Sequence, residues 1–286
     1  MSTRPLRQYY DPVTIEIDAE TAPGLGPWLR HRHRFVASLE KLSDDDWSAP
    51  TRCTAWDIKD VVSHLVSVDA FWVFTLGAAK SRSAPQKFLE HFDPSTGTDA
   101  MVAATRDLSS AEMLDKFASG TESLIQCVEG FEVADWQAPG ESPLGHLPAH
   151  FLFGHAFWDS WLHERDIFVV HGPPPAQEPD EIVAVTAFAL LFAGMQGGLV
   201  DDPLPVGAGL EEPLDVTLAF DEIERPLRVR YDRGTRVQVG DAAAAIAVGS
   251  AIGLVECGTG RRPMSELDPR VPANFAAHLD RAVQVL

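Results

Sequence analysis

Basic residues are scarce in this sequence. Its 286 residues include 42 acidic against 23 basic side chains, which gives a formal net charge of -19 at pH 7. Nucleic acids and anionic membrane surfaces are themselves negatively charged, so a chain this acidic is repelled by both. The composition therefore argues against nucleic acid and membranes as partners and favours a small-molecule substrate.

Cysteine is also rare, and its distribution is informative. The three cysteines, Cys53, Cys127 and Cys257, lie far apart and form no CxxC pair. This pattern does not fit a disulfide framework and is typical of a reducing compartment. The first twenty residues are polar and lack the apolar core of a signal peptide. We therefore expect a cytoplasmic protein.

Long apolar runs are almost absent. The exception extends from Ile182 to Val200, has no charged residue and is nearly long enough to cross a bilayer. Membrane-spanning helices usually carry basic anchors, whereas this run has acidic residues on both sides. We therefore expect a buried helix between two domains. The sequence also has no phosphate-binding loop, GxSxG elbow or dinucleotide fingerprint, which argues against the corresponding enzyme classes.

The N-terminal half predicts long amphipathic helices joined by loops. They are expected over about residues 26–42, from Thr54 onward, from Ser109 onward, and over about residues 147–170. The second and third should begin at capping boxes, in which Thr54 is followed by Asp57 and Ser109 by Glu112. Helices with apolar residues at this spacing bury one face against each other. Four of them predict a four-helix bundle.

The pattern changes after residue 200. Short alternating runs predict strands of an antiparallel sheet. The expected strands are "LDVTLAF", "LRVRYD", "RVQVG" and "AAIAVG", followed by the helices "SAIGLVEC" and "VPANFAAHLDRAVQVL". The fold class is therefore α + (α+β), with a four-helix bundle over residues 1–175 and a small α+β domain over residues 176–286.

One stretch of the fourth helix, "FWDSWLHERDIF" at residues 157–168, combines an acid and an imidazole. Asp159 and His163 are four residues apart and share a helix face, and His155 lies one turn earlier on that face. His155 and His163 are separated by roughly 12 Å of helix, too far for one small cation. The possible pairs are Asp159 with His163, or His155 with Asp159. His64, on the second helix, is the best candidate for a third ligand.

Two imidazoles and one carboxylate with a vacant position are the ligand set of catalytic zinc, and a thiol sulfur fits the vacancy. The plainer interpretation pairs Asp159 with Arg165 or a backbone donor and leaves His64 as an ordinary half-buried histidine. Asp166 could orient His163, because ligating imidazoles usually donate their second N–H. The other charges of "HERD" could simply solvate the helix end. Cys53 is expected to be a small buried residue rather than a nucleophile.

Three stretches, in this order, resemble signatures of the mycothiol-dependent maleylpyruvate isomerase family. The first is "APTRCTAWDIKDVVSHLVSVDAFW", with a T-x-C-x-x-W turn before a histidine-bearing helix. The second is "WDSWLHERDIF" and the third is "AAIAVGSAIGLVECGTGRR". The resemblance implies a DinB-like metal-binding bundle followed by a C-terminal domain related to sterol carrier folds.

The resemblance also implies a ligand set and a cofactor. His64, Asp159 and His163 match the family's metal ligands, with zinc as the expected metal and mycothiol as the thiol. The isomerase has a glutamate where this chain has Asp159, so the shorter arm must bring helix and metal closer together, or His155 could take its place. Arg261, in "GTGRR", best matches the arginine that serves the anionic substrate.

The resemblance implies an enzyme in which the zinc-bound thiolate adds to an electrophile, either for cis-trans isomerisation, as with maleylpyruvate, or for S-transfer to a co-substrate. A different class of function remains open, a non-catalytic binding protein that has kept the scaffold. A third alternative is a hydrolase that uses the metal to activate water and needs no thiol.

Overall fold

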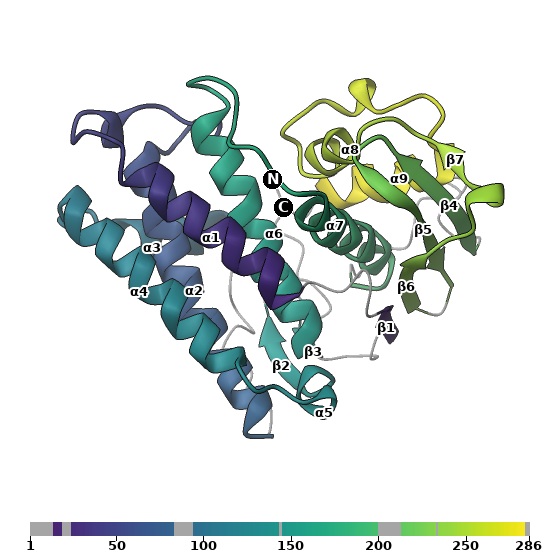
Figure 1. The fold of residues 1–286 in the computed structure, drawn as a ribbon, viewed down its shortest axis with the longest axis horizontal. Coiled ribbons are helices and arrows are strands. Elements are labelled where there is room, and N and C mark those ends of the chain that lie inside the picture. Colours follow the sequence, from purple (N-terminus) through teal and green to yellow (C-terminus); the bar gives the residue numbers. More distant parts are fainter. Residues whose placement is uncertain are drawn as a thin grey trace. The chain divides into compact units, whose positions relative to one another are not determined.

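The computed structural model describes residues 14–18, 24–82, 94–142, 145–199, 213–232 and 234–283 (Figure 1). The chain divides into two compact units. One, the helical unit, is Gly24–Gln177. The other, the sheet unit, combines Glu178–Leu286 with Met1–Pro23, so the segment before the helical unit belongs with the C-terminal part of the chain.

The helical unit is built on long helices that pack against one another. They are α1 (Leu25–Leu39), α2 (Ile58–Lys80), α4 (Ser110–Val128) and α6 (Ala149–Phe168). Helix α2 packs on α4 and α6, and α1 contacts the same two helices. Shorter elements complete the unit: η1 (Asp46–Ser48), α3 (Pro94–Ala103), α5 (Val133–Trp136) and the antiparallel hairpin of β2 (Pro139–Ser142) and β3 (Gly145–Pro148). The sequence patterns predicted the long helices but not α3, α5 or the hairpin.

The helix starts test the expected capping boxes. Ser109 caps α4 as predicted: its side chain accepts from the backbone N–H of Glu112, and the Glu112 carboxylate accepts in return from Ser109. The prediction for α2 was wrong. Asp57, not Thr54, is the N-cap, and its carboxylate accepts from the N–H of Asp60 at 2.9 Å. The residues from Thr54 to Trp56 form a turn before the helix, so the helix begins three residues later than the motif suggested.

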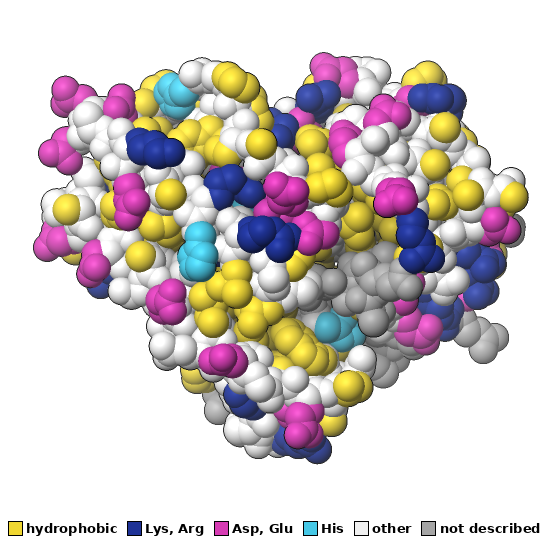
Figure 2. Space-filling model, viewed as in Figure 1, with side chains coloured by type: hydrophobic (Ala, Val, Ile, Leu, Met, Phe, Trp, Pro, Cys, Tyr) yellow, Lys and Arg dark blue, Asp and Glu magenta, His cyan; other side chains and the backbone are white. Residues whose placement is uncertain are grey.

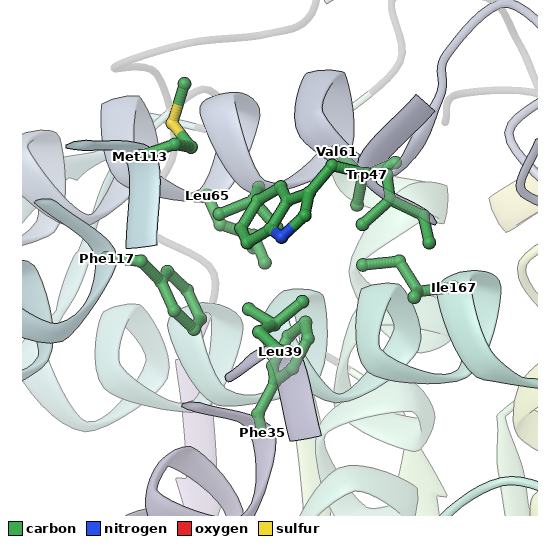
Figure 3. Close-up of a cluster of buried hydrophobic side chains, with 10 residues drawn as sticks. Phe35, Leu39, Trp47, Val61, Leu65, Met113, Phe117 and Ile167 are labelled. Atoms are coloured by element: carbon green, nitrogen blue, oxygen red, sulfur yellow. The ribbon is translucent and has the colours of Figure 1, made fainter. Parts of the chain in front are cut away.

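The apolar faces of these helices meet in one core. Phe35 and Leu39 of α1 pack with Val61 and Leu65 of α2, and Phe117 of α4 closes one side (Figure 3). Trp47, Met113 and Ile167 complete the cluster (Figure 3). Burying side chains of this size, at roughly 1.5–3 kcal/mol each, gives the helices a stable framework on which polar groups can be held.

The sheet unit contains a five-stranded mixed sheet in the order β1-β6-β5-β4-β7. Its strands are β1 (Thr14–Ile17), β4 (Leu214–Phe220), β5 (Ile223–Tyr231), β6 (Gly234–Val239) and β7 (Ile246–Ala247). Helices α7 (Pro179–Leu199), α8 (Ala251–Cys257) and α9 (Ala273–Val283) belong to the same unit. Ser250 caps α8 by accepting from the N–H of Gly253, as expected from the sequence.

The prediction of an antiparallel sheet was wrong at both edges. β4, β5 and β6 pair antiparallel, but β1 pairs parallel with β6 and β7 pairs parallel with β4. Alternation along a strand reports which face is buried and not the direction of its neighbour. Parallel neighbours cannot be joined by a hairpin, and here β1 comes from a segment that precedes the whole helical unit.

The apolar run from Ile182 to Val200 lies largely in α7, and the described side chains of this helix are mostly buried. Within its unit, α7 packs against β5, β6, α8 and α9. The expected buried helix is therefore present. Among the described helices, α2 is the one that is long and apolar enough to cross a membrane. Half of its most apolar stretch is buried inside the protein.

The cap of α2 gives a direct stability prediction. Asp57→Ala should lower the free energy of unfolding by about 1 kcal/mol, because the N–H of Asp60 loses its acceptor. Thr54→Ala is the matched control and should change it by less than about 0.5 kcal/mol. Urea denaturation of both variants measures the difference, and equal losses would reject Asp57 as the cap.

Candidate metal centre

The structure brings the three predicted ligands together. His64 comes from α2, while Asp159 and His163 come from successive turns of α6. The Nε2 atom of His64 is 3.5 Å from Oδ2 of Asp159, and Nε2 of His163 is 3.5 Å from Oδ1 of the same carboxylate. One ligand atom from each lies within 4.8 Å of the other two. The two imidazole rings meet edge to face, with centroids 5.0 Å apart.

The electrostatics of this group favour a positive charge at its centre. Burial lowers the pKa of His163, but the Asp159 carboxylate and the hydrogen bond to Asp166 outweigh it and raise the pKa to about 10. Burial raises the pKa of Asp159, yet the two imidazoles dominate and hold it well below the usual range. The carboxylate is therefore ionised and is balanced either by an imidazolium or by a bound cation.

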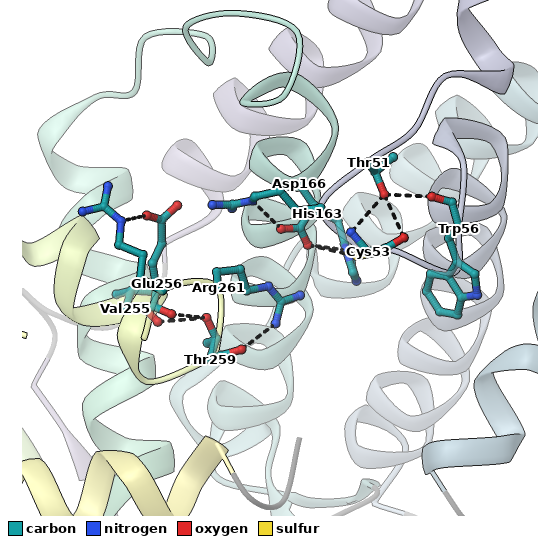
Figure 4. A network of polar contacts seen from close by, with 11 residues as sticks. Thr51, Cys53, Trp56, His163, Asp166, Val255, Glu256, Thr259 and Arg261 are labelled. Atoms are coloured by element: carbon teal, nitrogen blue, oxygen red, sulfur yellow. Dashed lines mark hydrogen bonds and ion pairs between the residues drawn. The ribbon is translucent and has the colours of Figure 1, made fainter. Parts of the chain in front are cut away.

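His163 is oriented from its other nitrogen. Its Nδ1 lies 3.1 Å from Oδ2 of Asp166, which is fully buried. Arg52 donates from Nε to Oδ1 of Asp166 at 3.0 Å. The Cys53 thiol donates to Oδ2, the oxygen that also faces His163, at 3.3 Å (Figure 4). Because Asp166 accepts a hydrogen bond from Nδ1, that nitrogen keeps its proton. Nε2 of His163, which faces Asp159, is then the nitrogen available to a metal.

The turn before α2 explains how Arg52 and Cys53 reach α6. The Thr51 hydroxyl accepts from the N–H of Cys53 at 3.0 Å and donates to the carbonyl of Trp56 at 2.9 Å (Figure 4). The backbone N–H of Arg52 donates to the carbonyl of Asp166 at 3.0 Å. The T-x-C-x-x-W motif is thus a hydrogen-bonded turn anchored on the helix that carries two of the candidate ligands.

The same turn also supports His64. The Trp56 ring lies against the His64 ring with centroids 5.3 Å apart, and its indole N–H donates to Asp99 of α3 at 3.1 Å. The Nδ1 atom of His64 is buried without a hydrogen-bond partner in the described part of the chain. His64 is therefore held by ring contacts, whereas His163 is held by a buried carboxylate.

Cys53, His163 and Asp166 form a second set of donors within 4.8 Å of one another. The Arg52 guanidinium already binds Asp166 there, and a fixed positive charge opposes a cation at the same carboxylate. Asp166 also uses one oxygen for the His163 ring. This set is better described as the outer shell of the His64, Asp159 and His163 group.

His155, the alternative to Asp159, has different surroundings. Its ring packs against Trp72 at 5.0 Å and Trp158 at 5.8 Å between centroids. It contributes no atom to the described group of donors around Asp159. Burial lowers the pKa of His155 to about 4, so its imidazole is neutral at physiological pH.

The sequence suggested that the remaining charges of "HERD" solvate the helix end, and the structure shows that they do not. Glu164 and Asp166 are fully buried and accept bonds from other segments, and the Arg165 guanidinium lies over the Trp161 ring at 5.1 Å. The sequence patterns did not identify Arg52 and Cys53 as neighbours of His163. The T-x-C-x-x-W motif was the available signal, but nothing in it revealed which helix the turn would contact.

Arg261 lies in the sheet unit, four residues after the end of α8. Its backbone N–H donates to the carbonyl of Glu256 at 2.9 Å, and its guanidinium donates to the carbonyl of Thr259 at 3.2 Å (Figure 4). These bonds hold the turn that follows α8. A role for Arg261 with an anionic substrate stays a prediction.

Comparison with known proteins gives a family match in the helical unit. A model of the mycothiol maleylpyruvate isomerase N-terminal domain matches residues 28–168, which include all three candidate ligands. The helical unit is therefore similar to the N-terminal domain of this family. The match covers the turn, α2 and α6, and so includes the first two of the three signatures that suggested the family; the third lies outside the matched residues.

Two solved structures share the overall fold. The crystal structure of the mycothiol-dependent maleylpyruvate isomerase aligns with a TM-score of 0.55 and 13% identity over 83% of this chain and 88% of that chain. A histidine-to-alanine mutant of that enzyme aligns with a TM-score of 0.54 and 12% identity over the same shares. The comparison with curated proteins gives no match. The likeness therefore extends the common fold into the sheet unit.

The neutral state of His155 gives a pH prediction. The unfolded chain protonates this imidazole near its ordinary pKa of 6.5 and the folded chain only near 4. Between these values the unfolded state binds more protons, so the free energy of unfolding falls as the pH is lowered. His155→Phe should lose less stability than the wild type between pH 7 and pH 5, measured by urea denaturation with a chelator present.

Leu152→Ala serves as the control for this experiment. Leu152 is fully buried on the same helix, and its truncation should lower stability by the same amount at both pH values. If His155→Phe and the wild type lose equal stability on acidification, the imidazole is not buried in its neutral form.

Proposed function

We propose that this protein is a zinc-dependent enzyme that uses mycothiol, or a similar low-molecular-weight thiol, to act on a small electrophile. The single observation that carries this proposal is the convergence of His64, Asp159 and His163 within 4.8 Å of one another. The family match over residues 28–168 supports the thiol. We propose the cytoplasm as the compartment, since a free thiol cofactor must stay reduced.

The donor set fits zinc. Two imidazole nitrogens and one carboxylate oxygen from two helices are a ligand set of catalytic zinc sites, which keep a further position for a small ligand. Bound there, the metal would supply a positive charge that lowers the pKa of a thiol well below about 8.5. The part of this chain is to hold the ligands: Asp166 orients His163, and Trp56 supports His64.

The aspartate also fits, despite its short arm. Both oxygens of Asp159 already approach the imidazoles, one at 3.5 Å from His64 and the other at 3.5 Å from His163. The packing of α2 against α6 brings the carboxylate within reach without an extra methylene. We therefore propose Asp159, rather than His155, as the third ligand.

The proposed chemistry is addition of a thiolate to an electrophilic carbon. In an isomerisation, a carbon–sulfur bond forms as the double bond opens, rotation follows, and the same bond breaks to return the thiol. In an S-transfer, the carbon–sulfur bond is kept in the product. Arg261 is proposed to bind an anionic group of the substrate, by its match to the family pattern.

The metal assignment predicts a simple pattern of metal content. His64→Ala and His163→Ala should each lose most of the bound zinc, because two donors hold a divalent cation far less tightly than three. His155→Ala is the matched control, from the same face of α6, and should keep about one zinc per chain. Elemental analysis after dialysis measures all three, and unchanged metal in His163→Ala rejects the site.

The thiol assignment predicts thiol-dependent turnover. The zinc-loaded protein should convert electrophiles such as maleylpyruvate when mycothiol is present, and His163→Ala should reduce the rate by at least about a hundredfold, since both metal and thiolate are lost. Mass spectrometry separates isomerised from thiol-conjugated products. Turnover without thiol would point instead to a hydrolase, and a zinc-loaded protein without turnover would point to a binding protein.

A further inference from the structure

A charged side chain that is not one of the three candidate ligands lies fully buried in the helical unit. Arg32 of α1 has 0% of its surface exposed. Its guanidinium donates from Nε to the Thr121 hydroxyl at 2.9 Å, from one terminal nitrogen to the Ser160 hydroxyl at 3.0 Å, and from the other to the Asp69 carboxylate. Burying an arginine is costly unless its donors are satisfied, so this arrangement needs an explanation.

The contacts of Arg32 join the long helices. Asp69 lies on α2, Thr121 on α4 and Ser160 on α6, while Arg32 itself is on α1. The guanidinium also lies over the ring of Phe117, with its central carbon 3.9 Å from the centroid. One planar group therefore fixes the relative positions of four helices through directional bonds.

Two further residues of α1 also bind α6. The Ser160 hydroxyl also bonds to Nε2 of His31 at 2.9 Å, and His31 lies 3.4 Å from Glu164. Arg34 donates to Glu164 at 2.9 and 3.1 Å. The serine, histidine and glutamate are ordered as in a hydrolytic triad, but each is fully buried and unable to meet a substrate, so the role of this network is structural.

The two α6 residues that α1 binds are direct sequence neighbours of the two candidate ligands on α6. Ser160 directly follows Asp159, and Glu164 directly follows His163. On α2, Asp69 lies five residues after His64. The bonds of α1 therefore fix the height and rotation of α6 relative to α2, and these determine whether His64 reaches the carboxylate and imidazole on α6.

Apolar packing alone specifies this register less well. Hydrophobic cores tolerate repacking, and they lose a unique arrangement before they lose stability. A buried ion pair adds little net stability, since desolvation offsets its attraction, but in some proteins it selects one arrangement of helices. A metal centre with ligands on two helices needs that selection, because donor positions must be held within about 0.5 Å.

We propose that Arg32, with Asp69, is a positioning residue for the metal centre. Its guanidinium group sets the register of α2 against α6 and so preorganises His64, Asp159 and His163. This inference rests on the proposed function, because it concerns the same site. It adds a determinant of metal affinity that has no contact with the metal.

The test replaces the ion pair by apolar residues of similar size, in the double variant Arg32→Met with Asp69→Leu. Removing both charges together avoids leaving one of them buried and unpaired. We expect the variant to fold with stability close to that of the wild type in urea. Its zinc affinity, measured by competition with a chelator, should fall by about tenfold or more, the usual effect of losing support around a ligand.

A spectroscopic measurement separates positioning from stability. The cobalt-loaded double variant should give a visible absorption spectrum with altered band positions, because the ligand geometry has changed. Met113→Ala is the control. Met113 is buried on α4, which carries no candidate ligand, and its truncation should lower the midpoint of urea denaturation while leaving the zinc affinity and the cobalt spectrum unchanged.

Ser160→Ala keeps the proposal testable if the double variant does not fold. It removes the bond from Arg32 to α6 and retains the charge pair with Asp69, so a smaller loss of zinc affinity in the same direction is expected. Wild-type affinity and spectrum in folded double or single variants would overturn the positioning role alone. A wild-type protein that binds no zinc would instead overturn the proposed function.

Discussion

An ionised, half-buried carboxylate beside two imidazoles requires a positive charge, and much of the helical unit is organised around this requirement. Asp159 receives both imidazoles, one from its own helix and one from α2. Neither helix alone could assemble the group, because α6 offers just two donors that one cation could share. The chemistry of the site therefore depends on how two helices are held against each other, and the apolar core provides the bulk of that contact without defining its fine register.

Two kinds of support surround the centre, and they differ in character. His163 has a carboxylate behind it, which is itself held by Arg52 and Cys53 from a turn more than a hundred residues earlier in the chain. His64 has ring contacts with Trp56 and His163. A hydrogen bond fixes both the tautomer and the direction of a ring, whereas an aromatic contact fixes its plane. The α6 ligand is consequently the better determined of the two histidines.

Much of this arrangement was accessible from the sequence, for physical reasons that can be stated. The four-residue spacing of Asp159 and His163 places them on one face whenever the segment is helical, and the Ser109 cap is a local signal with local partners. His64 was chosen for its place on the second helix, and the family resemblance supported that choice, but its proximity to α6 is a tertiary contact that no local pattern specifies. Alternation of apolar residues also located β4, β5 and β6 closely.

What the sequence did not reveal depends on contacts between distant segments. The cap of α2 moved to Asp57 because the preceding residues fold into a turn that contacts α6. The buried bonds of Arg32 involve three other helices, and a lone arginine in an amphipathic pattern is ordinarily read as exposed. The parallel pairing of β1 with β6 is also a contact between distant segments. The four residues of β1 carry no pattern that indicates which strand they pair with.

That pairing has a consequence for the order in which the protein is made. β1 leaves the ribosome first among the described elements, yet its neighbour β6 is synthesised more than two hundred residues later. The helical unit lies between them in the sequence and has a buried core of its own. Pairing of β1 with β6 therefore follows synthesis of the whole helical unit, which makes closure of the sheet a late step in folding.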